Sequence, residues 1–172
     1  MIYIDIDGVL ADSDGFLAML DPQALKDTHR LFKTIYKNYT RVFKESKPLV
    51  DLSFLKNLKE FTLLTALPNS RNIDSFAVDE VETKRIMKTL EDNKKQWVAQ
   101  HIGDCNLIIL ELRADKSKFC KSTDDILIDD NKDTGKRWKA AGGRYFSSVA
   151  EYLNSINDQG VSQQLVECNL FD

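Results

Sequence analysis

The chain is poor in cysteine, proline and glycine, and each shortage argues against a class of protein. Its 172 residues include three cysteines, three prolines and seven glycines. Cys105, Cys120 and Cys168 are odd in number, and none has CxxC or Cys/His ligand spacing, so neither a disulfide framework nor a zinc site is predicted. So few prolines and glycines leave no room for a long flexible linker or a collagen-like segment.

Long apolar runs and a strong charge imbalance are also missing. The longest apolar runs fall far short of the ~20 residues that a membrane span needs, and no basic segment followed by an apolar run marks a secretory signal. The formal net charge of −3 gives no overall attraction to nucleic acid or membrane, although a local basic patch could still bind a polynucleotide. We therefore expect a cytoplasmic globular protein without a membrane partner.

The hydrophobic pattern alternates between short strands and helices. Strands are predicted at 2–6, 61–65, 107–110, 126–128 and 145–146. Helical patterns cover 12–47 (with a break at Asp21-Pro22), 82–101, 132–141 and 148–156, and 52–58 has a short helical face. Residues 70–80 are predicted to be loop. Alternating strands and helices predict an α/β fold with a parallel sheet and helices on both faces.

The helical stretch between the first two strands is too long for a simple crossover. It is interpreted as a small helical cap over the strand ends, inserted after the first strand. The predicted organisation is therefore an α/β core at 1–11 and 48–160, a cap at 12–47 and a C-terminal tail at 161–172.

Two pairs of carboxylates follow apolar strands. Asp5 and Asp7 come at the end of the first strand, and Asp129 and Asp130 follow the run Ile-Leu-Ile. Ligands bind at the carboxyl ends of strands in such sheets, and buried paired carboxylates are costly unless a cation compensates them. Because both pairs offer only oxygen ligands, the sequence predicts one shared site for Mg²⁺.

These residues resemble the four signature motifs of the haloacid dehalogenase (HAD) superfamily of phosphatases, in the right order. The motifs are Asp5-Ile-Asp7-Gly8-Val9, Leu63-Leu64-Thr65, Lys116 and Ile128-Asp129-Asp130. The early helical cap, the run from Lys95 to His101 before the third strand, and Gly142-Gly143 narrow the resemblance to the 5′(3′)-deoxyribonucleotidases and their phage and bacterial relatives. The resemblance implies a HAD-like Rossmannoid sheet.

The resemblance also implies a role for each motif. Asp5 would attack phosphorus and form an aspartyl-phosphate, and Asp7 would be the general acid and base. Thr65, Ala66 and Lys116 would contact the phosphate. The Mg²⁺ ligands would be Asp5, the backbone carbonyl of Asp7, and Asp130 or Asp129. Lys118 is the alternative to Lys116, and one residue of the Asp129-Asp130 pair could instead hold the lysine by a salt bridge.

The substrate is expected to be a small phosphomonoester, with a deoxyribonucleoside monophosphate favoured. The alternatives are a HAD phosphatase for polynucleotide ends or another phosphorylated metabolite, and a binding protein without activity. The candidate substrate contacts are Phe16, Tyr39, Arg41, Asn69 and Arg71. Because aromatic residues at helical spacing are most often core, packing is the competing interpretation for those of the cap. The oligomeric state is not predicted.

Overall fold

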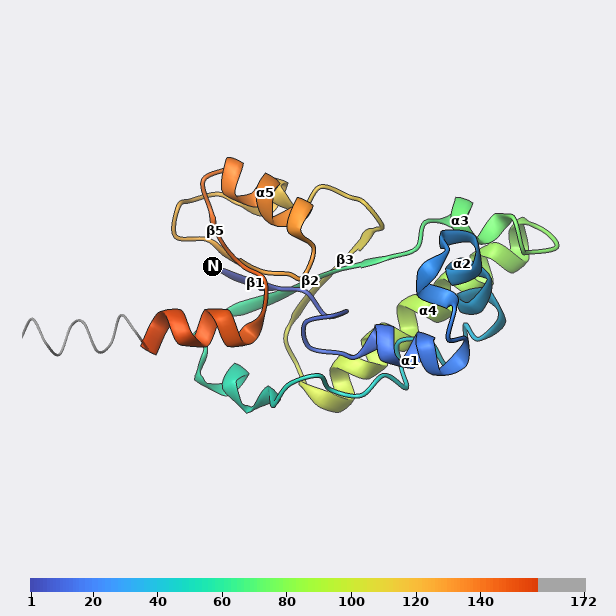
Figure 1. The fold of residues 1–172 in the computed structure, drawn as a ribbon, viewed down its shortest axis with the longest axis horizontal. Helices are drawn as coiled ribbons and strands as arrows, with labels where there is room; N and C mark the ends of the chain where they lie inside the picture. Colours follow the sequence, from blue (N-terminus) through green and yellow to red (C-terminus); the bar gives the residue numbers. More distant parts are fainter. Residues whose placement is uncertain (158–172) are drawn as a thin grey trace, which may run out of the picture.

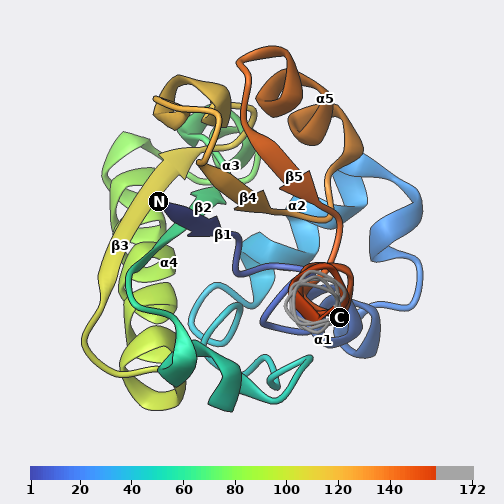
Figure 2. The same cartoon turned by 90° about the vertical axis from the view of Figure 1, so that its left-hand side faces the viewer.

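Five parallel strands form the centre of the molecule in the order β3-β2-β1-β4-β5. The computed structural model describes residues 1–157, and its sheet is visible in two orthogonal views (Figures 1 and 2). The strands are β1 (Ile2–Ile4), β2 (Phe61–Leu67), β3 (Asn106–Glu111), β4 (Ile126–Ile128) and β5 (Arg144–Phe146). The predicted α/β fold with a parallel sheet is therefore confirmed.

Helices connect these strands. They are α1 (Ser13–Leu20), α2 (Thr28–Lys37), α3 (Ser70–Asp74), α4 (Glu80–His101) and α5 (Lys132–Ala140), with short 3-10 helices η1 (Ala24–Lys26), η2 (Leu52–Asn57) and η3 (Lys116–Phe119). A last helical segment at 149–157 matches the prediction for 148–156. The predicted tail at 161–172 lies outside the described residues. Within residues 1–157, no helix is long and apolar enough to cross a membrane.

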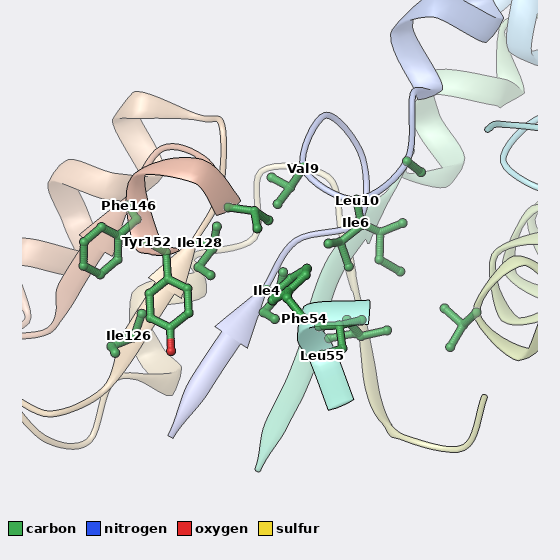
Figure 3. Packing of buried hydrophobic residues seen from close by; sticks show 14 of the residues in the cluster. Ile4, Ile6, Val9, Leu10, Phe54, Leu55, Ile126, Ile128, Phe146 and Tyr152 are labelled. Atoms are coloured by element: carbon green, nitrogen blue, oxygen red, sulfur yellow. The ribbon is translucent and has the colours of Figure 1, made fainter. Parts of the chain in front are cut away.

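Alternate residues of each strand point to opposite faces of the sheet, and a hydrophobic cluster covers each face. On one face, Leu64 and Leu127 form a cluster with Trp138 of α5. On the other face, Ile4 and Ile128 belong to a larger cluster (Figure 3). That larger cluster also includes Phe54 of η2, Trp97 and Val98 of α4, and Val149 and Tyr152 of the last helix. The apolar residues of the strands thus contribute to two hydrophobic layers, one on each face of the sheet.

Residues 12–47, which the sequence predicts to be a cap, share their hydrophobic cluster with other parts of the chain. Phe16, Phe32 and Ile35 pack in one cluster with Ile73 of α3 and with Ile86 and Leu90 of α4. In Figure 1, α1, α2 and α3 lie beyond the ends of the strands. The chain enters and leaves the insertion side by side, since Asp12 N donates to Lys47 O and Leu49 N to Leu10 O, each at 2.8 Å.

Two segments differ from the sequence interpretation. Residues 38–45 form turns rather than helix, and Phe43 has the left-handed φ of 69°, which an α-helix does not tolerate. The prediction of a loop over 70–80 is wrong in part, because α3 lies there. Asn69 and Asn72 start that helix by a capping box, in which each side chain accepts from the other residue's backbone N–H at 3.1 Å.

Candidate active site

The carboxyl ends of four strands meet around one cavity of about 450 Å³. Asp5 and Asp7 follow β1, Ala66 lies near the end of β2, Lys116 follows β3, and Asp129 follows β4. The cavity is lined by Asp5, Asp7, Gly8, Asp14, Ala66, Leu112, Arg113, Ala114, Lys116, Asp129, Asp130, Asn131, Asp133, Thr134 and Arg137. The structure therefore brings together residues from the first, third and fourth predicted motifs, as expected for parallel strands.

Lys116 is the cation at the centre of this group. It is buried at the start of η3, and its Nζ lies 2.7 Å from Asp5 Oδ2 and 2.7 Å from Asp129 Oδ2. Lys118 is exposed on the same short helix and lines no part of the cavity. Of the two candidate lysines, Lys116 therefore lies at the cavity and Lys118 does not.

Asp129 and Asp130 have different surroundings. Asp129 is completely buried, and both of its oxygens are used: Oδ2 pairs with Lys116, and Oδ1 accepts from Asn131 N at 2.8 Å. Asp130 is exposed and forms no ion pair within residues 1–157. Asp129 thus supports the lysine, whereas Asp130 keeps its oxygens available to a ligand.

One carboxylate oxygen each from Asp5, Asp129 and Asp130 lie within 4.8 Å of one another. Burial raises the pKa of Asp5 from 3.8 to about 6, with Lys116 acting against the rise and Asp129 adding to it. Partial loss of hydration and the charge of Asp129 also raise the pKa of Asp130. These three carboxylates therefore carry more negative charge than Lys116 compensates, and they could hold a divalent cation.

Gly8 allows the loop after β1 to pass close to Asp130. Its φ is +73°, and a Cβ at this position would lie 2.4 Å from Asp130 Oδ2. Its N–H donates to Ala11 O at 3.0 Å, which closes the turn that leads into the cap. A side chain here would displace the carboxylate that remains available to a ligand.

The Asp7 side chain is held from three sides. Ser13 Oγ donates to Asp7 Oδ1 at 2.5 Å, and Thr65 Oγ1 donates to Oδ2 at 3.4 Å. Lys94 Nζ of α4 also donates to Oδ2, and this ion pair was not predicted from the sequence. The signal was present, because Lys94 lies four residues after Leu90 and three before Trp97 on the buried helix face.

Thr65 lies deeper than expected for a phosphate contact. It is completely buried and does not line the cavity, whereas its neighbour Ala66 does. The Thr65 hydroxyl is occupied by Asp7 and Lys94. Within the described chain, the threonine therefore contacts the predicted acid and base rather than the open space of the cavity.

None of the five predicted substrate contacts lines the cavity. Phe16 is buried in the cap cluster, with the Arg41 guanidinium 5.7 Å from its ring centroid, and Tyr39 packs against the same cluster. Asn69 caps α3, and Arg71 is exposed on that helix. The packing interpretation thus describes the two aromatic residues.

Two other arginines line the cavity instead. Arg113 lies just after β3 with a left-handed φ of 70°, and it forms no ion pair among residues 1–157. Arg137 of α5 forms an ion pair with Asp115, with 3.5 Å between Arg137 Nε and Asp115 Oδ1. Arg113 could be placed near this edge from the sequence, because it follows the predicted third strand, but it was given no role. Arg137 was not a candidate, because charged residues outside a recognised motif usually belong to a solvated surface.

Comparison with protein-family models and with curated proteins found no match for this chain. The geometry of the cavity and the charges around it are therefore the basis of the functional proposal.

Proposed function

We propose that this protein is a magnesium-dependent phosphomonoesterase of the HAD type, which releases phosphate from deoxyribonucleoside monophosphates. The observation that supports it most is the Asp5–Lys116–Asp129 bridge, with both distances at 2.7 Å, at the carboxyl edge of a parallel sheet. Asp7 lines the same cavity two residues after Asp5. This arrangement supports the proposal, because Asp5, Asp7 and Lys116 would then act as nucleophile, proton carrier and cation around one space.

The carboxylate group fits Mg²⁺, because all its donors are oxygens and Asp130 is free of ion pairs within residues 1–157. Asp5 and Asp130 would hold the ion, while Asp129 stays with Lys116. When bound, Mg²⁺ supplies charge neutralisation, which reduces the repulsion between Asp5 and a phosphate dianion.

The protein residues would then act in two steps. In the first, an Asp5 oxygen forms a bond to phosphorus while the bond to the leaving oxygen breaks, and Asp7, which must be protonated for this step, gives its proton to that oxygen. In the second, Asp7 takes a proton from water, the water oxygen bonds to phosphorus, and the bond to Asp5 breaks. Lys116 stabilises the charge on the transferring phosphoryl group in both steps.

Phosphate release tests this proposal directly. The protein is assayed on mononucleotides, sugar phosphates and phosphorylated oligonucleotides, with Mg²⁺ and with chelator. We expect release that requires Mg²⁺ and is abolished in Asp5→Asn, whereas Asp124→Asn, at an exposed position outside the cavity, retains it. Activity of Asp5→Asn, or full activity in chelator, would contradict the mechanism.

A second candidate substrate is the phosphorylated end of a polynucleotide, and the lining of the cavity favours it. Among the described residues the lining contains no aromatic side chain on which a base could stack, but it contains Arg113 and Arg137. Guanidinium groups bind phosphate with two parallel hydrogen bonds, so they suit a substrate with further phosphate groups.

The two substrates are separated by comparing thymidine 5′-monophosphate with a 5′-phosphorylated oligonucleotide. If the polynucleotide is the substrate, Arg113→Gln raises KM for the oligonucleotide about tenfold and leaves KM for the mononucleotide unchanged. Arg71→Gln, an exposed arginine outside the cavity, is the control. Preference of the wild type for the mononucleotide, with no effect of Arg113→Gln, would support the deoxyribonucleotidase. Preference for sugar phosphates would contradict both substrates but not the phosphatase chemistry.

A further inference from the structure

Lys94 is a completely buried lysine in the middle of α4. Its ammonium group has three N–H donors, and three acceptors surround it. They are Asp7 Oδ2, Thr65 Oγ1 at 2.9 Å and the backbone carbonyl of Ala66 at 2.6 Å. The centroid of the Phe43 ring, in the cap, lies 4.3 Å from Lys94 Nζ. Every donor of a buried charge is therefore used, as a stable buried ammonium requires.

The cost of burying this charge indicates a role beyond packing. A buried ion pair is often no more stabilising than apolar side chains of similar volume, because both charges lose their hydration. Leu90 and Trp97 occupy the same helix face at 0% and 1% exposure, so an apolar residue would suit this position. Lys94 instead forms an ion pair with Asp7, whose side chain is 30% exposed at the cavity.

The hydrogen bonds of Lys94 fix the direction of the Asp7 carboxylate. Asp7 follows β1 in a loop, and its Oδ1 is held by Ser13 at the start of the cap. Lys94 and Thr65 hold Oδ2 from α4 and β2. The carboxylate thus has little rotational freedom, which favours a reproducible position relative to a phosphate on Asp5.

We propose that Lys94 is a positioning residue for the proton transfers of Asp7. This inference rests on the proposed phosphatase function. Lys94 touches neither the phosphate nor the leaving group; it holds Asp7 so that the carboxyl group reaches the leaving oxygen and, later, the attacking water. Lys94 also contacts Phe43 of the cap. The same ammonium group therefore touches both the cap and Asp7.

The test compares two substrates that differ in their need for a proton. An alkyl phosphomonoester such as a nucleotide releases an alkoxide that must be protonated, whereas p-nitrophenyl phosphate releases a stabilised phenolate. In Lys94→Met we expect kcat/KM for the nucleotide, which reports the steps up to departure of the leaving group, to fall about 10–100-fold. The loss of kcat/KM for p-nitrophenyl phosphate should be much smaller, because its leaving group needs no proton. The hydrolysis of the aspartyl-phosphate is common to both substrates and enters kcat alone. Lys95→Met, on the exposed neighbour, is the matched control and should match the wild type.

A double-mutant cycle completes the test. In an Asp7→Asn background, Lys94→Met should cause no further loss, because the group that it positions is already absent. Equal losses of kcat/KM on both substrates, or additive losses of kcat/KM in the cycle, would show a merely structural role and overturn the proposal. If Lys94→Met does not fold, Lys94→Gln, which keeps two N–H donors, is compared on the same substrates. An inactive wild type would overturn the phosphatase itself, whereas an active wild type with equal losses overturns only the role of Lys94.

Discussion

The replacement of Asp5 by asparagine is expected to stabilise the metal-free protein while abolishing its activity. Asp5 is buried beside Asp129, and its pKa is raised from 3.8 to about 6 despite the pairing with Lys116. The folded protein therefore holds the Asp5 proton more tightly than the unfolded chain does. Asparagine resembles the neutral carboxyl group in size and shape, so it removes the cost of the buried charge.

The magnitude follows from the pKa. Each pKa unit corresponds to 1.36 kcal/mol, so a rise from 3.8 to about 6 corresponds to about 3 kcal/mol. Because the pKa is raised on folding, this contribution is absent below about pH 4, grows as the pH rises, and reaches its full unfavourable value above about pH 6. At about pH 7.5 Asp5→Asn should thus unfold with a free energy up to about 3 kcal/mol higher than the wild type. Below about pH 4 the two should be nearly equal.

Urea denaturation in chelator at both pH values measures this difference. The other carboxylates titrate in both proteins, so their contributions largely cancel in the comparison. The exposed Asp133, paired with Lys136, provides the control, and Asp133→Asn should change stability by less than about 0.5 kcal/mol. Adding Mg²⁺ should stabilise the wild type and have less effect on Asp5→Asn, because a ligand is lost. If Asp5→Asn in chelator is less stable than the wild type at about pH 7.5, the cost of burying the Asp5 charge does not exceed the stabilisation from its pairing with Lys116.

Three further predictions concern the same site. Lys116→Met should lower the free energy of unfolding in urea by about 3–5 kcal/mol, because it leaves two buried carboxylates without their cation. Lys118 is exposed, so Lys118→Met should leave the free energy of unfolding almost unchanged. Gly8→Ala should lower the Mg²⁺ affinity measured by calorimetry about tenfold, because the new Cβ would meet Asp130. Gly103→Ala is the control: Gly103 also has a positive φ but has open space around it, so the Mg²⁺ affinity should not change. Removing Mg²⁺ with chelator should lower the wild-type melting temperature, and restoring Mg²⁺ should reverse the change. An unchanged melting temperature would argue against Mg²⁺ binding at this site.

Much of the fold follows from local sequence pattern. Isoleucine and leucine alternate or run together in 2–6, 61–65 and 126–128, and such segments form strands wherever both faces are covered. The helix at 82–101 could be placed because Ile86, Leu90 and Trp97 repeat at helical spacing. The turns at 38–45 and the short helix α3 could not, because a single capping box or left-handed residue changes the local structure without changing the apolar pattern.

For the candidate site, the sequence by itself determined that the two acidic pairs lie at strand ends, and parallel pairing of β1 and β4 then brings them to one edge. Only the tertiary structure decided which groups meet. Lys116 reaches Asp5 across 111 residues, and Lys94 reaches Asp7 across 87. Such contacts depend on where η3 and α4 pack against the sheet, and no local preference encodes that position. The same packing placed Arg113 at the cavity and buried Phe16 in the cap.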